Sequence, residues 1–227
     1  MNNLSKVLRH LFSPIWPVNC PICNNPLLPH EEVLCLGCLA KIPRINIDRT
    51  HTFLGAPENS VKQYSWFVYN TEHPAHLLIH DIKYNDRRKL ARKLGREFAM
   101  QKLMDNKSFD LIIPIPIHWT KLLKRSYNQT HEIALGVSDI LKVPVSKALY
   151  AKREHDTQTR KSTKQRIKNV EGIFALRDPE KLNGMNIAIL DDVITTGATM
   201  FSALQAILEK SSPASVSFLS LAQTGSF

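Results

Sequence analysis

The stretch Asn186-Ile187-Ala188-Ile189-Leu190-Asp191-Asp192-Val193-Ile194-Thr195-Thr196-Gly197-Ala198-Thr199 decides the fold of this chain. It begins with a short apolar run of the kind that forms a strand buried on both faces, and two adjacent carboxylates follow where this strand should end. A small turn that contains glycine comes next, and then an amphipathic helical segment at residues 200–210. The order of strand, loop and helix predicts one unit of an open α/β sheet, in which ligands bind at the carboxyl ends of the strands.

The residue types of this loop favour a sugar phosphate as the ligand. A small turn at a helix N-terminus directs several backbone N–H groups at one anion, and the helix dipole and threonine hydroxyls add to the attraction. Lysine is absent from the loop, so this is not the Walker A loop of triphosphate-binding proteins. The carboxylates of Asp191 and Asp192 suit a neutral cis-diol or a hydrated Mg²⁺. A diol beside a monophosphate describes a ribose 5-phosphate; the alternative is a structural Asp-rich turn before a threonine-capped helix.

Residues 190–199 resemble the phosphoribosyl-pyrophosphate (PRPP) motif of type I phosphoribosyltransferases. The resemblance implies an α/β fold with a central, mostly parallel sheet flanked by helices. It also implies that the two acidic residues hold the ribose 2- and 3-hydroxyls and that the loop holds the 5-phosphate. The PRPP-binding residues expected in this stretch are Asp191, Asp192, Val193, Thr195, Thr196, Gly197, Ala198 and Thr199.

Length and composition fit such a protein. The 227 residues, 43% of them hydrophobic, suffice for one α/β domain and a small appendage. A net charge of +10 favours phosphate-bearing partners, although a solvated basic face is common in proteins of other functions. No apolar run reaches the roughly 18 residues of a membrane span, and no signal peptide is recognisable, so a cytoplasmic location is expected.

The four cysteines of the chain form two matched C-x₂-C pairs, Cys20 with Cys23 and Cys35 with Cys38. The spacing C-x₂-C-x₁₁-C-x₂-C is typical of a four-thiolate zinc site, which is structural because four protein ligands leave no open position. Two disulfides are the alternative, but a reducing compartment disfavours them. The predicted organisation is an N-terminal helix and zinc-ribbon-like module at residues 1–45, a linker at 46–60 and a phosphoribosyltransferase-like domain at 61–227.

The remaining elements follow from apolar periodicity and from glycine and proline positions. Strands are expected at 61–69, 110–113, 147–152, 172–176 and 215–222, the last closing the sheet, and helices at 3–13, 74–84, 87–103 and up to about 141. In the helix at 74–84 the inward residues are expected to be Leu77, Leu78 and Ile82. After the strand at 110–113 come cations that are well placed to receive a pyrophosphate, namely Lys121, Lys124 and Arg125.

Two further stretches, with the cysteine module, extend the resemblance over nearly the whole chain: Pro114-Ile-Pro-Ile-His118 through Tyr127-Asn128-Gln129, and Arg153-x₄-Gln158-x₇-Arg166-x₂-Asn169-Val170. In this order they resemble the ComF/GntX family of phosphoribosyltransferase-like proteins associated with competence, the handling of incoming DNA. The resemblance implies Mg²⁺ bound with PRPP, PRPP contacts by Lys124, Tyr127 and Asn128, and the catalytic set Asp191, Asp192, Arg125, Arg153 and Arg166.

Two departures from the family pattern are visible. Ser126 follows Arg125 where family members usually carry glycine, so a backbone conformation that needs glycine is in question. The polar run at 159–163 replaces a bulky apolar residue.

PRPP binding with phosphoribosyl transfer is the favoured function, and other functions remain open. One alternative is a non-catalytic single-stranded-DNA-binding competence factor with a regulatory or vestigial PRPP site. In it, a basic helix face (Arg88, Arg92 and Arg96) and the basic loop at 153–169 contact the nucleic acid. A solvated helix face and a loop that closes over a phosphorylated substrate are the competing interpretations. Two interpretations of the aromatic residues Trp16, Tyr64 and Trp66 are equally supported: a place in the core, or a platform on which bases stack. A structural adaptor that docks a competence or DNA-processing protein is the third hypothesis.

Overall fold

The computed structural model describes residues 18–29, 31, 34–72, 74–105, 108–152 and 172–224. The side chains of Pro74, Lys121 and Lys124 are also outside this description. The helix predicted at 3–13, Trp16 and the basic segment at 153–169, with Arg153 and Arg166, lie outside the described residues.

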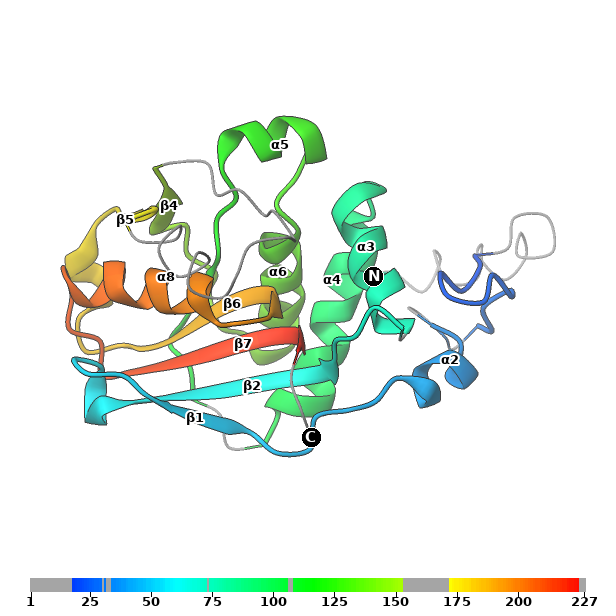
Figure 1. Ribbon diagram of the computed structural model, residues 1–227, viewed down its shortest axis with the longest axis horizontal. Helices are drawn as coiled ribbons and strands as arrows, with labels where there is room; N and C mark the ends of the chain where they lie inside the picture. The colour runs from blue at the N-terminus through cyan, green and yellow to red at the C-terminus, as the bar shows by residue number, and fades with distance from the viewer. Residues whose placement is uncertain are drawn as a thin grey trace.

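A five-stranded sheet forms the centre of the molecule (Figure 1). Its order is β1-β2-β7-β6-β3, and every neighbouring pair except β1–β2 is parallel. The strands are β1 (Arg49–Thr52), β2 (Ser60–Val68), β3 (Leu111–Pro114), β6 (Asn186–Ile194) and β7 (Ser215–Gln223). A separate two-stranded antiparallel sheet joins β4 (Leu149–Ala151) to β5 (Phe174–Leu176). This arrangement confirms the predicted mostly parallel α/β sheet.

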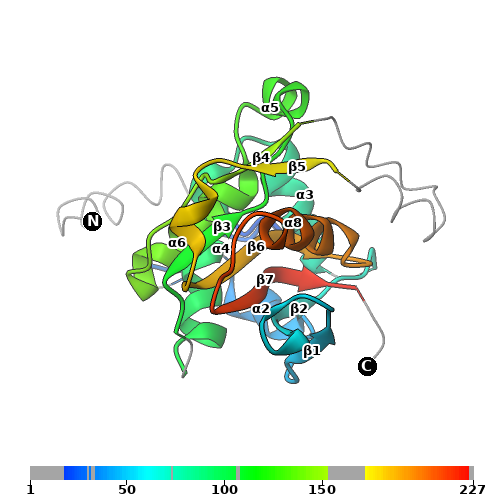
Figure 2. The ribbon, with the colours of Figure 1, turned by 90° about the vertical axis from the view of Figure 1, so that its left-hand side faces the viewer.

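Helices cover both faces of the sheet, as Figures 1 and 2 show. On one face lie α3 (Pro74–Tyr84), α4 (Arg88–Phe98) and α6 (Gln129–Leu141), and on the other lies α8 (Ala198–Leu208). The shorter helical pieces are α2 (Leu36–Lys41), α5 (Trp119–Arg125), η1 (Pro57–Asn59), η2 (Ala99–Leu103) and η3 (Pro179–Leu182).

The alternation of side chains along β6 explains these layers. Ile187 and Ile189 pack toward α8, whereas Ala188 and Leu190 pack toward the α4 and α6 layer, and all four are fully buried. The strand buried on both faces is therefore confirmed. It continues to Ile194, because pairing with β7 extends that far, so the two aspartates are strand residues and not the start of the loop.

Several expectations were wrong in detail. The strand at the end of the chain, β7, lies between β2 and β6 and does not close the sheet at an edge. The segment expected to be an irregular linker contains β1, which pairs with β2. Residues 119–125 form α5, a helix that was not predicted, and Leu77 is 49% exposed instead of facing inward. The errors in strand pairing and strand order concern tertiary contacts, which local sequence periodicity does not determine.

The helices α4 and α6 pack backbone to backbone through two glycines. A Cβ atom at Gly136 would lie 2.0 Å from the carbonyl oxygen of Arg92, and one at Gly95 would lie 2.1 Å from that of Ile133. Since no side chain fits at such a distance, this close approach requires glycine on both helices. It fixes α6, and with it the residues at the N-terminus of α6, against the sheet.

Candidate functional site

The two adjacent aspartates lie at the carboxyl end of β6, and they face different surroundings. Asp192 is 4% exposed, and its Oδ2 atom lies 3.1 Å from Lys83 Nζ and 3.1 Å from Gln129 Nε2. Asp191 is half-buried, and its Oδ1 atom accepts a hydrogen bond of 2.8 Å from the backbone N–H of Asp192. Of the two carboxylates expected to face a sugar, Asp192 therefore turns inward to a lysine, and Asp191 keeps partial access to solvent.

The charges of this acidic pair are strongly coupled to Lys83. Burial, and then the charge of Asp192, raise the pKa of Asp191 to about 7, against the opposing charge of Lys83. Burial alone lowers the pKa of Lys83, but the charges of Asp192 and Asp191 outweigh it, so this pKa is raised. Lys83 is thus a cation at neutral pH, and Asp191 exchanges its proton near neutrality.

The loop at 195–199 connects this strand end to α8. Gly197 has a φ of 76° at the N-cap position of α8, a left-handed conformation that glycine adopts without strain. Thr195 and Thr196 are exposed, and the hydroxyl of Thr196 accepts a hydrogen bond of 3.4 Å from the N–H of Ala198. Exposed hydroxyls and the N–H groups of a helix N-terminus are donors of the kind that anions accept from.

The segment after β3 is fastened to the same strand end. The N–H of Ile115 donates to the carbonyl oxygen of Leu190 at 2.8 Å, and the side chain of Asn128 donates to the carbonyl oxygen of Ile115 at 3.1 Å. Asn128 also caps α6, since its Oδ1 atom accepts from Thr130 N–H at 3.1 Å. Tyr127 is buried, and its hydroxyl donates to the carbonyl oxygen of Ile82. Both predicted PRPP contacts therefore have hydrogen-bond partners inside the protein.

Arg125 ends α5 beside this cluster. Its guanidinium stacks on the ring of Tyr84, 5.2 Å from the ring centroid, and its charge acts on Lys83. The next residue, Ser126, has a φ of 58°, so the conformation expected to need glycine is kept by serine. The side chain of Lys124 lies outside the described residues.

Sequence reasoning missed two residues of this site, Lys83 and Gln129. Gln129 is 4% exposed, and its Oε1 atom has no hydrogen-bond partner among the described residues. It belongs to the Tyr-Asn-Gln stretch, so a signal for it was present. Lys83 carries no local signal, because its importance depends on α3 packing beside β6.

The cysteine cluster has the geometry of a metal site. The four sulfur atoms of Cys20, Cys23, Cys35 and Cys38 lie within 4.8 Å of one another, none in a disulfide, and Cys23 and Cys35 are 3.6 Å apart. Tetrahedral Zn–S bonds of about 2.3 Å place sulfur atoms roughly 3.8 Å apart, which fits this spacing. The buried carboxylate of Glu31 accepts from the N–H groups of Leu28 and Leu36 at 2.7 Å, and so braces the segment between the two cysteine pairs.

One thiol of this cluster, that of Cys20, has a lowered pKa, which favours the metal-binding thiolate form. Burial raises the pKa of the Cys20 thiol, but hydrogen bonds from the backbone of Cys23, Cys35 and Ile22 outweigh it and lower the pKa to about 7. Thiolates are the form that binds metal. The cluster has the geometry to hold a metal ion such as zinc.

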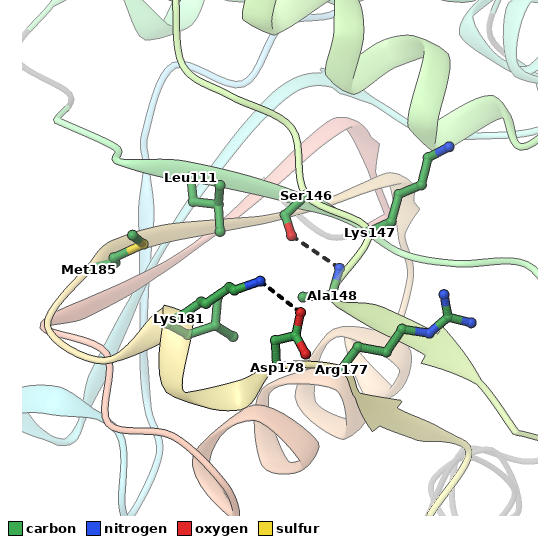
Figure 3. Close-up of a pocket in the computed structure, with 9 residues that line it drawn as sticks. Leu111, Ser146, Lys147, Ala148, Arg177, Asp178, Lys181 and Met185 are labelled. Atoms are coloured by element: carbon green, nitrogen blue, oxygen red, sulfur yellow. Dashed lines mark hydrogen bonds and ion pairs between the residues drawn. The ribbon is translucent and has the colours of Figure 1, made fainter.

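A cavity of about 380 Å³, shown in Figure 3, is lined by residues other than Asp191 and Asp192. Leu111, the first residue of β3, and Met185, which precedes β6, line it, so it opens at the opposite ends of these strands. Figure 3 shows Lys181 paired with Asp178 at 2.8 Å on its wall. None of the predicted ligand-binding residues lines this cavity.

The arginines of α4, which favoured nucleic-acid binding in the sequence, lie beside aspartates of the protein itself. Arg88 pairs with Asp86 at 3.0 Å, Arg92 binds Asp139 through two hydrogen bonds, and Arg96 lies 3.9 Å from Asp139. Tyr64 and Trp66 are buried core residues, so neither is a stacking platform. Among the described residues, no helix is long and apolar enough to cross a membrane.

Comparison with known proteins agrees with this architecture. The family model of the phosphoribosyl transferase domain matches residues 128–226. The DNA utilization protein YhgH of Escherichia coli O157:H7 is 26% identical over 217 residues, which cover 85% of this chain and 91% of that protein. Competence protein ComFC of Bacillus subtilis is 27% identical over 222 residues, 97% of this chain and 80% of its own. Competence protein F of Haemophilus influenzae is 26% identical over 198 residues, 80% and 86% of the two chains.

These relatives align over most of the chain, which contains the mostly parallel sheet and the four-cysteine cluster. Over most of its length the chain is similar to competence-associated proteins of the ComF family, and residues 128–226 match the phosphoribosyl transferase domain.

Proposed function

We propose that this protein binds PRPP and transfers its phosphoribosyl group, in a process of DNA uptake or DNA utilisation. The observation that carries the proposal is the convergence at one end of β6: a half-buried carboxylate, an anion-binding turn before α8, and the cations Lys83 and Arg125. The names of the relatives YhgH and ComFC supply the link to DNA.

Each group has a distinct part in this proposal. Asp191 accepts the ribose hydroxyls, with Asp192 behind it, and the 195–199 loop beside Val193 donates to the 5-phosphate. Arg125 and Lys124, with Arg153 and Arg166, offset the charge of the departing pyrophosphate. Tyr127 and Asn128 hold the segment that carries Arg125, because both are hydrogen bonded to the protein.

No protein nucleophile is needed for this reaction. The C1–O bond of PRPP lengthens toward an oxocarbenium ion as pyrophosphate leaves, and the protein contributes position and charge. When bound with PRPP, Mg²⁺ would offset the charge of the departing pyrophosphate, and the carboxylates of Asp191 and Asp192 would help to hold it.

Calorimetric titration with PRPP and Mg²⁺ tests the binding. The wild type is expected to bind, and a variant with Asp191→Asn and Asp192→Asn is expected to lose about 100-fold or more in affinity. A wild type that binds no PRPP would end the proposal. Incubation with PRPP, Mg²⁺ and a panel of bases and amines then tests transfer, with pyrophosphate release as the signal.

We also assign zinc to the four-cysteine cluster, in a structural role. Elemental analysis of the purified protein is expected to give one zinc per chain. Its loss on substituting Cys23 and Cys35 by serine would support these ligands, whereas full zinc content in that variant would refute them.

Single-stranded DNA binding is a second candidate, favoured by one surface. On α5, which stands apart from the sheet in Figures 1 and 2, Trp119 and Leu123 are 63% and 76% exposed, and Arg125 ends the same helix. An exposed indole beside cations is suited to stacking on a base. An oligonucleotide shift assay over a salt series tests this, and no shift at low salt would remove it.

A further inference from the structure

Lys83, the penultimate residue of α3, belongs to this convergence but has no assigned part in binding the ligand. Its Nζ atom reaches across to Asp192 Oδ2 at 3.1 Å, and its side chain is 23% exposed against 6% for Asp192. The end of α3 is held in place by Tyr127, whose buried hydroxyl donates to the carbonyl oxygen of Ile82. Lys83 is therefore positioned by packing and points at the acidic pair from a separate element.

Two adjacent carboxylates form a poor environment for a sugar that carries a phosphate and a diphosphate. Like charges a few ångströms apart repel strongly where water is partly excluded. When both carboxylates are ionised, Lys83 changes the net charge of the cluster from −2 to −1. Arg125 adds a second cation nearby, since its guanidinium stacks on the ring of Tyr84, the residue that follows Lys83. Two cations, Lys83 and Arg125, therefore lie near the acidic pair, whereas Lys83 alone completes the ion pair with Asp192.

Gln129 gives an independent indication that the cluster is completed by a ligand. Its Nε2 atom donates to Asp192, which leaves the Oε1 atom of the same amide buried without a partner among the described residues. A buried acceptor of this kind is costly unless a donor reaches it. A ribose hydroxyl bound beside the acidic pair would supply that donor.

We infer that Lys83 is a ligand-binding residue of this site, a built-in cation that lets the acidic pair accept a polyanionic sugar phosphate with reduced dependence on Mg²⁺. This inference rests on the proposed binding of PRPP. Without Lys83, the metal carried by the ligand has to offset one more negative charge. The dependence of affinity on Mg²⁺ is therefore the property that Lys83 controls.

The experiment measures the dissociation constant of PRPP in Mg²⁺ and in EDTA, for the wild type and matched variants. In the wild type, removing Mg²⁺ is expected to weaken binding about tenfold. In Lys83→Met the same removal is expected to weaken it about 100-fold or more, since one extra charge repels the bare ligand. Lys83→Arg is expected to recover most of the difference.

Lys181→Met is the control, because Lys181 is also paired with an aspartate but lines the distant cavity. For this variant, the ratio of the PRPP dissociation constant in EDTA to that in Mg²⁺ is expected to equal the wild-type ratio. A double variant, Lys83→Met with Asp192→Asn, removes one charge of each sign, so its ratio is expected to return toward the wild-type value even if its affinity is low. That variant also distinguishes charge from loss of folding.

The outcomes separate the inference from the function beneath it. If the wild type binds PRPP, and a folded Lys83→Met protein shows the wild-type Mg²⁺ ratio, Lys83 is a structural residue and the inference is wrong. If the double variant keeps the steep ratio of Lys83→Met, net charge is not the cause and the inference is again wrong. If the wild type binds PRPP in neither condition, the proposed function itself fails.

Discussion

Two lysine–aspartate pairs, toward opposite ends of β6, differ in what they do for the molecule. Lys181 and Asp178 approach to 2.8 Å within one turn, but their side chains are 73% and 61% exposed. Lys83 and Asp192 are farther apart, at 3.1 Å, yet only 23% and 6% exposed, and they join α3 to β6. The shorter contact is the one that water can replace. Burial and origin in distant segments, more than distance, therefore mark the pair that is expected to contribute to stability.

The largest expected effect is on stability when the buried pair is broken. Lys83→Met leaves Asp192 buried without its cation, so the free energy of unfolding is expected to fall by about 3 kcal/mol. Lys181→Met removes a cation from a solvated carboxylate and is expected to leave the unfolding midpoint unchanged. Urea titration of the two variants beside the wild type measures both. Losses of equal size would contradict the contrast drawn from burial.

The acidic pair also predicts a pH dependence with a defined sign. The pKa of Asp191 is raised from 3.8 to about 7, so the folded state keeps a proton that the unfolded state loses. The stability contributed by this proton is fully present below pH 3.8 and is lost as the pH rises through about 7. Asp191→Asn, which needs no proton, is expected to match the wild type at pH 4 and exceed it by on the order of 2 kcal/mol at pH 8.

Asp178 supplies the opposite case for the same measurement. The hydrogen bond from Lys181 lowers the pKa of Asp178, so its contribution is present at neutral pH and is lost on acidification. Asp178→Asn is expected to change the unfolding midpoint little at any pH, and any loss should appear at the high end. For Asp191, the raised pKa would be refuted if the free energy of unfolding of Asp191→Asn and that of the wild type changed with pH in the same way.

The sequence predicted most of the parallel sheet, because strands such as 187–190 are continuously apolar and the turns around them contain glycine and proline. It did not predict β1 or the central place of β7, since strand order depends on pairing between segments far apart in the chain. Ser126 illustrates a subtler limit, because its left-handed backbone was expected to need glycine and serine adopts it.

The site shows the same division. The motif at 190–199 located the strand end and the turn before α8, because those residues are contiguous. It could not reveal that Asp192 faces Lys83 and Gln129, which come from α3 and α6. Sequence adjacency gave two equivalent carboxylates, and tertiary packing made them different.

The coupling between Lys83 and Asp192 can be measured directly. A double-mutant cycle with Lys83→Met and Asp192→Asn is expected to give an interaction free energy of about 1–2 kcal/mol, because each residue is the other's buried partner. The same cycle on Lys181 and Asp178 provides the comparison and is expected to be zero within error. A cycle at Lys83 that is equally small would mean that solvent reaches the pair freely.

The smallest expected effect on stability is that of Ser126→Gly, at the residue that follows Arg125. Ser126 has a φ of 58°, which costs a side-chain-bearing residue more than glycine. Its hydroxyl recovers some of this cost by donating either to the carbonyl oxygen of Arg125 at 2.6 Å or to Asp86 at 3.2 Å. Ser126→Gly is therefore expected to stabilise the protein by about 0.5–1 kcal/mol, measured as a rise in the urea midpoint. The matched control is Lys142→Gly, at a φ of 61° after α6 and far from the pair. If Lys142→Gly stabilises the protein and Ser126→Gly does not, the hydrogen bond made by the Ser126 hydroxyl outweighs the backbone strain at this residue.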